Sequence, residues 1–169
     1  SVHFVPFIYC FAMIYKILPH VETIIILNFL LLVSSIIPLF KLSIINKRSE
    51  EFAIFIGALF VWYLTFQYII LYEFEMLRFS IPIILWMLYF WEKKSLKLFF
   101  LFVLLATLVR EEVGLTITMF GCYVILTEKR YRLGLVTALV GLVAFGIISE
   151  VIMPLLRTTP EYRHIAANS

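Results

Sequence analysis

Residues 106–115, ATLVREEVGL, place three consecutive charges inside an apolar run that extends from Leu98 to Thr127. The charged residues are Arg110, Glu111 and Glu112. Charge at the centre of a lipid bilayer is costly, and irregular backbone is tolerated at that depth only where protein or water satisfies its polar groups. We therefore interpret the run as two short helices that meet at Arg110–Glu112, and not as one helix with charges at its midpoint.

The composition of the chain indicates a membrane protein. Hydrophobic residues make up 63% of the sequence and aromatic residues 17%, whereas soluble domains are about 45–50% apolar. Several apolar runs approach or exceed the ~20 residues that a helix needs to cross a bilayer. The net charge of +3 does not indicate nucleic-acid binding, because the basic residues flank the apolar segments. The expected partner is the lipid bilayer, with no nucleic acid.

The apolar pattern predicts an all-α, polytopic bundle of about six membrane helices that follow an N-terminal interfacial helix. Residues 4–18 are too short to cross a bilayer and are expected to lie at its interface. Pro38 predicts a kink in the first membrane segment. The chain starts at Ser1, so we expect a fragment of a larger membrane protein, with one transmembrane domain over 1–156 and a polar tail over 157–169. The six segments are 23–45, 52–71, 77–91, two within 98–127, and 133–153.

The orientation of these segments follows from the Lys and Arg residues between them, since cytoplasmic loops carry the excess of both. Three loops have three basic residues each, and the intervening loops, with Arg78 and Arg110, have one each. The alternation predicts that the loops at 46–51, 92–97 and 128–132 are cytoplasmic, and that 72–77 and 110–112 face outward. The basic residues of the rich loops are Lys41, Lys47, Arg48, Lys93, Lys94, Lys97, Lys129, Arg130 and Arg132.

The outward side is therefore expected to gather the chemically active side chains. Carboxylates can act as general bases or bind a divalent cation, and arginine can hold a phosphate through paired hydrogen bonds. The structural alternatives are an ion pair between Glu75 and Arg78, one between Arg110 and a neighbouring carboxylate, and a surface position for His3. The candidate catalytic residues are Glu73, Glu75, Glu111 and Glu112, and the candidate substrate-binding residues are Arg110, Arg78 and His3.

Two stretches resemble known membrane proteins. Residues 3–43, HFVPFIYCFAMIYKILPHVETIIILNFLLLVSSIIPLFKLS, resemble the segment of GT-C glycosyltransferases that follows the first outer loop. Residues 72–117, YEFEMLRFSIPIILWMLYFWEKKSLKLFFLFVLLATLVREEVGLTI, resemble a family of predicted bacterial and archaeal membrane proteins of unknown function that is related to that superfamily. In this family an Asp-Phe-His-like motif begins one span, and a Lys-Glu-Asp-like motif opens a later helix.

The resemblance covers nearly the whole chain and assigns residues to both motifs. Glu73-Phe74-Glu75 takes the place of the first motif, although Glu75 stands where the family tends to have His. Arg110-Glu111-Glu112 takes the place of the second, and the resemblance gives Arg110 the role of the basic residue that contacts a lipid-linked phosphate. The acidic catalytic motif of the GT-C first outer loop would lie upstream of Ser1.

The resemblance implies transfer of a sugar from a polyprenyl-phosphate donor at the outer face of the plasma membrane of a bacterium or archaeon. Two alternatives remain open. A transporter would need ionisable residues across the whole membrane, and the segments below the outer layer are almost purely apolar. A non-catalytic membrane scaffold would keep the fold without the chemistry.

Overall fold

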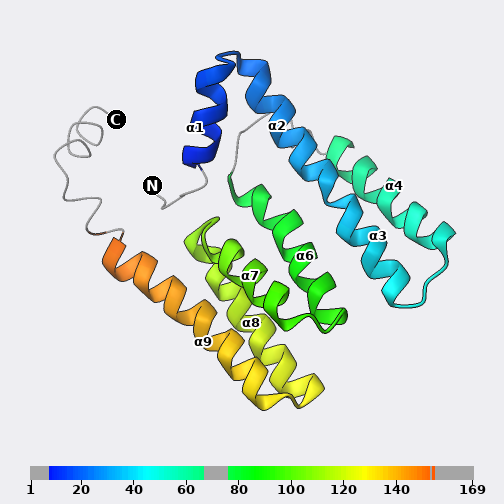
Figure 1. Ribbon diagram of the computed structural model, residues 1–169, viewed down its shortest axis with the longest axis vertical. Coiled ribbons are helices and arrows are strands. Elements are labelled where there is room, and N and C mark those ends of the chain that lie inside the picture. The colour runs from blue at the N-terminus through cyan, green and yellow to red at the C-terminus, as the bar shows by residue number, and fades with distance from the viewer. Residues whose placement is uncertain (1–7, 67–75, 153, 155–169) are drawn as a thin grey trace. The chain divides into compact units, whose positions relative to one another are not determined.

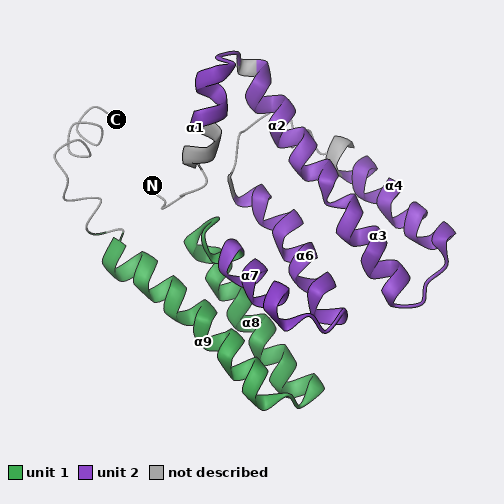
Figure 2. Cartoon of the chain, viewed as in Figure 1, with its two compact units in different colours: residues 1–5, 106–169 green, residues 6–105 purple. Residues whose placement is uncertain are grey.

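The computed structural model describes residues 8–66, 76–152 and 154, and all regular structure in these residues is helical (Figure 1). The all-α prediction is thereby confirmed. The chain divides into two compact units (Figure 2). One unit contains residues 6–105, and the other contains residues 1–5 and 106–169.

The 6–105 unit is built around α3, which packs against both α4 and α6. Helix α2 contacts α1, α3, α6 and the short 3-10 helix η1. Helix α7 begins in this unit, and its last two residues belong to the other unit. The elements are α1 (Ile8–Ile17), α2 (Val21–Ser34), α3 (Ile36–Ile45), α4 (Glu50–Phe66), η1 (Met76–Phe79), α6 (Ser80–Glu92) and α7 (Leu96–Thr107).

The first predicted membrane segment contains the expected break, but the break lies upstream of the proline. Helix α2 ends at Ser34, Ser35 forms a turn, and α3 begins at Ile36. A proline in a helix removes one backbone N–H and clashes with the carbonyl four residues earlier, and for Pro38 that carbonyl belongs to Ser34. At the break, the backbone N–H of Ser35 donates to the Leu32 carbonyl, three residues earlier, at 3.0 Å. The helix therefore breaks one turn before Pro38, next to the carbonyl with which the proline ring would clash.

Aromatic side chains join α6 to α7. The Trp91 and Phe99 rings lie 5.0 Å apart, and the Phe90 and Phe102 rings lie 5.3 Å apart, between centroids. Phe99 is fully buried. The contacting residues lie in the last turn of α6 and the first two turns of α7. The short loop at 93–95 is therefore sufficient to bring these two helix ends together.

In the described part of the other unit, α8 (Glu111–Glu128) and α9 (Tyr131–Ile147) form a hairpin, and a π-helical turn, η2 (Ile148–Ile152), follows it. Glycines allow the two backbones to touch. A Cβ added to Gly141 would lie 2.5 Å from the Gly114 carbonyl oxygen, and one added to Gly134 would lie 2.7 Å from the Gly121 carbonyl oxygen. The pairing of an early α8 residue with a late α9 residue makes the hairpin antiparallel. Small residues at such contacts are typical of helices that associate in membranes.

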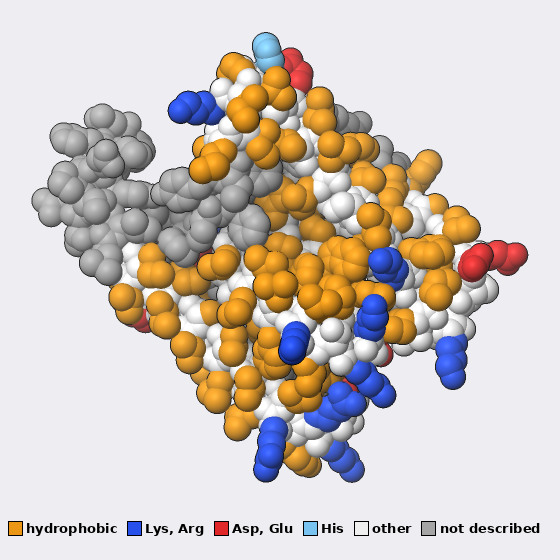
Figure 3. Space-filling model, viewed as in Figure 1, with side chains coloured by type: hydrophobic (Ala, Val, Ile, Leu, Met, Phe, Trp, Pro, Cys, Tyr) orange, Lys and Arg blue, Asp and Glu red, His pale blue; other side chains and the backbone are white. Residues whose placement is uncertain are grey.

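Helix lengths agree only in part with the predicted membrane segments. Among the described residues, Glu22–Ile45 and Tyr131–Ile152 are long and apolar enough to cross a membrane by length and composition. Helix α7 is apolar but shorter. Hydrophobic side chains cover much of the visible surface (Figure 3), which is the distribution expected where lipid replaces water. The count of six membrane helices stays a prediction, and part of the segment at 52–71 lies outside the described residues.

The three loops with an excess of Lys and Arg share a backbone feature. Lys47, Lys94 and Lys129 each have a positive φ, of 58°, 59° and 56° respectively. The left-handed conformation is common just after a helix, where glycine usually adopts it. A side chain makes this conformation less favourable by roughly 1–2 kcal/mol. Each loop therefore keeps a lysine at a position where glycine would be less strained.

Candidate functional site

The predicted corner at Arg110–Glu112 lies at a junction between two helices, which the structure places at 108–110. Helix α7 ends at Thr107, and α8 begins at Glu111. Arg110 is the N-cap residue of α8 and has an extended backbone, with φ −163° and ψ 149°. Glu111 and Glu112 occupy the first turn of α8, where negative charge interacts favourably with the helix dipole. The local sequence thus explains both the end of one helix and the start of the next.

Arg110 and Glu112 form an ion pair. The Arg110 Nη2 atom lies 3.3 Å from Glu112 Oε1. The Arg110 side chain is only 15% exposed, whereas that of Glu112 is 51% exposed. Glu111 is buried, at 6% exposure. At this corner the Arg110 and Glu111 side chains are therefore largely buried, and the Glu112 side chain reaches the surface.

The other predicted site residues lie in the 6–105 unit or outside the described residues. Arg78 lies in η1, within the 6–105 unit, and is half-buried. Glu73, Glu75 and His3 lie outside the described residues. The expectation that the 72–78 corner lies close to Arg110–Glu112 stays a prediction.

The carboxylates of the corner do not form a metal site by themselves. Within 8–66, 76–152 and 154, no group of three or more His, Cys, Asp or Glu side chains is arranged to hold a metal ion. Glu111 and Glu112 together supply two carboxylates, so a divalent cation at this corner would need ligands from elsewhere.

Two buried polar side chains in the first membrane segment escaped the sequence interpretation. Asn28 is 2% exposed and Ser35 is fully buried. Among the described residues, Asn28 Oδ1 and Ser35 Oγ have no hydrogen-bond partner. The two residues are seven apart and therefore near the same face of the segment. The sequence does mark Asn28, because it is the one strongly polar residue in the run 24–33.

The glycine contacts of the hairpin were missed as well. Gly114 and Gly121 are seven residues apart, as are Gly134 and Gly141. Thr118, between the first pair, donates a hydrogen bond to the Gly114 carbonyl at 2.9 Å, and its hydroxyl lies 3.4 Å from the Ala138 carbonyl oxygen of α9. Equal spacing of small residues on two neighbouring helices is a recognisable sign of close packing.

Comparison with known proteins identifies the family. Residues 1–168 match a family described as predicted membrane protein (DUF2079). No curated protein and no solved structure matches the chain. The match confirms the resemblance to a family of membrane proteins of unknown function. The chain belongs to the predicted membrane protein family DUF2079.

Proposed function

We propose that this chain is part of a GT-C-like, multi-pass protein of the plasma membrane that transfers a sugar from a polyprenyl-phosphate donor at the outer face. The observation that carries the proposal is the position of Arg110. Its guanidinium is largely buried at the break between two apolar helices. A buried arginine at such a break is a functional candidate by default, because ionisable groups at membrane depth are costly to keep.

The chemistry of the corner suits a phosphate. Arginine presents donors in a planar fork that matches phosphate oxygens, and backbone N–H groups at a helix N-terminus attract anions. Arg110 lies immediately before the first turn of α8. Its ion pair with Glu112 uses an exposed carboxylate, which can move into solvent at little cost. A phosphate could therefore take the place of Glu112 beside the guanidinium.

The carboxylates have a separate role in this proposal. Glu111 and Glu112, with Glu73 and Glu75 of the other predicted corner, would position the acceptor or a divalent cation. Arg78 and His3 would add donors for the head group. This part depends on the two corners lying on the same side of the membrane.

The orientation that the proposal needs is supported by the lysine positions. In each loop predicted to be cytoplasmic, a lysine occupies a left-handed position where glycine would be less strained. A requirement for positive charge on one side of the membrane explains why lysine is present in all three loops.

The alternative is a non-catalytic membrane scaffold, in which Arg110 has only a structural role. The Arg110–Glu112 pair favours this alternative, because an ion pair can orient the start of α8 without binding any ligand. The two functions make different predictions for the same substitution.

The test uses Arg110→Gln and Arg110→Lys, with Arg130→Gln as the matched control. Arg130 is likewise an N-cap residue paired with a glutamate two positions away, at 3.6 Å from Glu128, but its side chain is 41% exposed. The protein is purified in lipid nanodiscs, and its affinity for a polyprenyl phosphate and its thermal unfolding are measured for each variant.

A phosphate-binding arginine predicts a specific loss of affinity. A hydrogen bond to a charged group contributes roughly 1.5–3 kcal/mol, so Arg110→Gln should weaken polyprenyl-phosphate binding about tenfold to a hundredfold. Arg110→Lys should retain part of the affinity, and Arg130→Gln should retain all of it. If Arg110→Gln lowers only the unfolding temperature and binding is unchanged, the scaffold alternative is correct and the phosphate role is wrong.

A further inference from the structure

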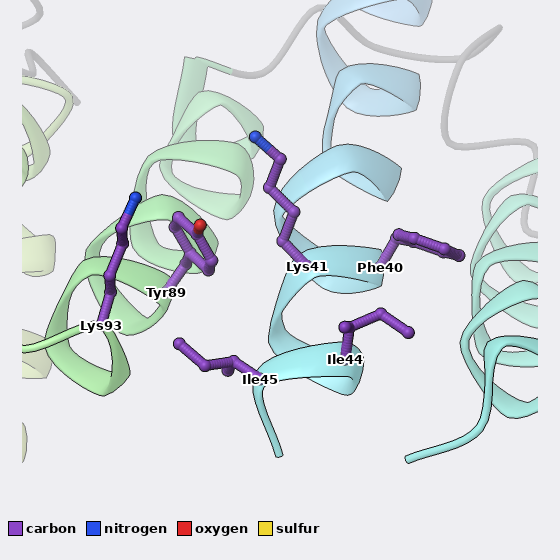
Figure 4. A pocket seen from close by; sticks show the side chains of 6 residues that line it. All are labelled: Phe40, Lys41, Ile44, Ile45, Tyr89 and Lys93. Atoms are coloured by element: carbon purple, nitrogen blue, oxygen red, sulfur yellow. The ribbon is translucent and has the colours of Figure 1, made fainter. Parts of the chain in front are cut away.

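A pocket lies between α3 and α6, within the 6–105 unit. Its volume is about 300 Å³, and it is lined by Phe40, Lys41, Ile44, Ile45, Tyr89 and Lys93. Figure 4 shows Tyr89 between the two lysine side chains. Phe40, Ile44 and Ile45 of α3 supply the apolar part of the lining. None of these residues belongs to the Arg110 corner, so a ligand of this pocket does not depend on the proposed glycosyl transfer.

Aromatic rings hold both ammonium groups at the rim of this pocket. The Lys41 Nζ atom lies 5.0 Å from the centroid of the Trp86 ring and 5.7 Å from that of Tyr89. The Lys93 Nζ atom also lies 5.7 Å from the Tyr89 centroid. A cation within about 6 Å of an aromatic ring is attracted to its face. Both ammonium groups are therefore attracted to the same ring, that of Tyr89.

Within the described part of the chain, no acidic side chain pairs with either lysine. The ion pairs of Arg110 with Glu112 and of Arg130 with Glu128 involve neither of them. Glu92 is adjacent to Lys93 in the sequence but is exposed, and it lies outside these pairs. Two like charges held near one ring repel each other, so a bound anion would stabilise the arrangement.

The location of the pocket indicates which class of anion it would bind. Helices α3 and α6 end at the loops 46–49 and 93–95, which are two of the Lys-rich loops. Lys41 lies four residues before Ile45, the last residue of α3, which is about 6 Å along a helix. Its ammonium can therefore reach toward the membrane surface while its stem lies along apolar side chains. Exposed Ile37, Ile44 and Ile45 make the neighbouring surface of α3 suitable for acyl chains.

We propose that this pocket binds one anionic phospholipid, with its phosphate between Lys41 and Lys93 and an acyl chain along Phe40, Ile44 and Ile45. Basic pockets between membrane helices are suited to anionic head groups, and each lysine near the surface adds to the attraction. A zwitterionic lipid offers the same acyl chains, but its own cation would lie close to the two ammonium groups. The site therefore selects lipids by the charge of the head group.

The test uses Trp86 as a reporter, because its ring already lies against Lys41. Trp62→Phe and Trp91→Phe leave Trp86 as the single tryptophan. The protein is reconstituted in phosphatidylcholine bilayers that contain small, equal fractions of brominated phosphatidylglycerol or brominated phosphatidylcholine. Bromine quenches tryptophan fluorescence only at short range, so the ratio of quenching by the two lipids measures selectivity at the pocket.

We expect phosphatidylglycerol to quench Trp86 more strongly than phosphatidylcholine at the same mole fraction. Each lysine near a membrane surface changes the affinity for anionic lipid about fivefold, so Lys41→Gln with Lys93→Gln should lower the preference roughly 25-fold or abolish it. Lys94→Gln with Lys97→Gln removes the same charge from adjacent exposed positions that do not line the pocket, and it should lower the preference much less. Lys41→Arg with Lys93→Arg should restore it.

Three results would overturn the proposal. Equal quenching of Trp86 by the two lipids, in the single-tryptophan protein that keeps Lys41 and Lys93, would show that the pocket has no selectivity. Selectivity that survives Lys41→Gln with Lys93→Gln, in protein whose helical circular dichroism is unchanged, would place the lipid elsewhere. An equal loss of selectivity in Lys94→Gln with Lys97→Gln and in Lys41→Gln with Lys93→Gln would show that surface charge, and not this pocket, causes the preference.

Discussion

Gly114 and Gly141 touch across the α8–α9 hairpin, so that neither position has space for a side chain. A Cβ on Gly114 would lie 2.7 Å from the Gly141 carbonyl oxygen, and a Cβ on Gly141 would lie 2.7 Å from the Thr118 backbone nitrogen. Both distances are shorter than any unstrained contact between such atoms. The glycine pair therefore sets how closely α8 approaches α9, and hence how the first turn of α8, with Glu111 and Glu112, is held.

Gly141→Ala should destabilise the hairpin. The added methyl group meets backbone and not a flexible side chain, so α8 and α9 must separate, and overpacking of this kind costs about 1–3 kcal/mol. Gly146→Ala is the matched control on the same helix, because nothing lies within 4 Å of a Cβ there. The control should be neutral or slightly stabilising, by about 0.5–1 kcal/mol, since alanine favours helix more than glycine does. Unfolding in detergent, followed by circular dichroism, measures both. Equal stability of the two variants would contradict the close contact.

Asn28→Leu should stabilise the 6–105 unit. Asn28 Oδ1 is buried without a hydrogen-bond partner among the described residues, and an unsatisfied buried polar group costs about 1–3 kcal/mol. Leucine has a similar volume and removes the polar atoms. Thermal unfolding of the purified variant should therefore occur at a higher temperature, and Asn28→Asp should lower that temperature because the buried group would then carry charge. A lower unfolding temperature for Asn28→Leu would mean that the amide is satisfied by a bound water or ligand in the native protein.

Cysteine labelling should confirm the predicted orientation. In a background with Cys10→Ser and Cys122→Ser, a cysteine at Glu73 should react with an impermeant thiol reagent added outside intact cells. Cysteines at Ser95 and Lys129 should react only after the membrane is permeabilised. The reason is the excess of Lys and Arg at 92–97 and 128–132. The opposite labelling pattern would place Arg110 on the cytoplasmic side and remove the basis for an outward-facing donor site.

The sequence by itself determined the helical class, the membrane setting and a break near Arg110–Glu112, which the structure places at 108–110. Each of these depends on local properties: the length of apolar runs, the cost of charge within them, and the preference of acidic residues for the first turn of a helix. Helices α7 and α8 accordingly end and begin within a few residues of the predicted corner. The identity of the candidate residues Arg110, Glu111 and Glu112 followed from the same local argument.

Only the tertiary structure decided which side chains meet. The Arg110 ion pair is with Glu112 at 3.3 Å, and a local sequence argument left Glu111 equally possible. The approach of Lys41 and Lys93 to one ring joins residues 52 positions apart in the sequence, and the Gly114–Gly141 contact joins residues 27 apart. When a helix is apolar on nearly every side, its sequence does not indicate which face is buried, because the same apolar side chains can contact either lipid or protein. Pairing between such helices is decided by close packing, and packing depends on the partner as much as on the sequence of either helix.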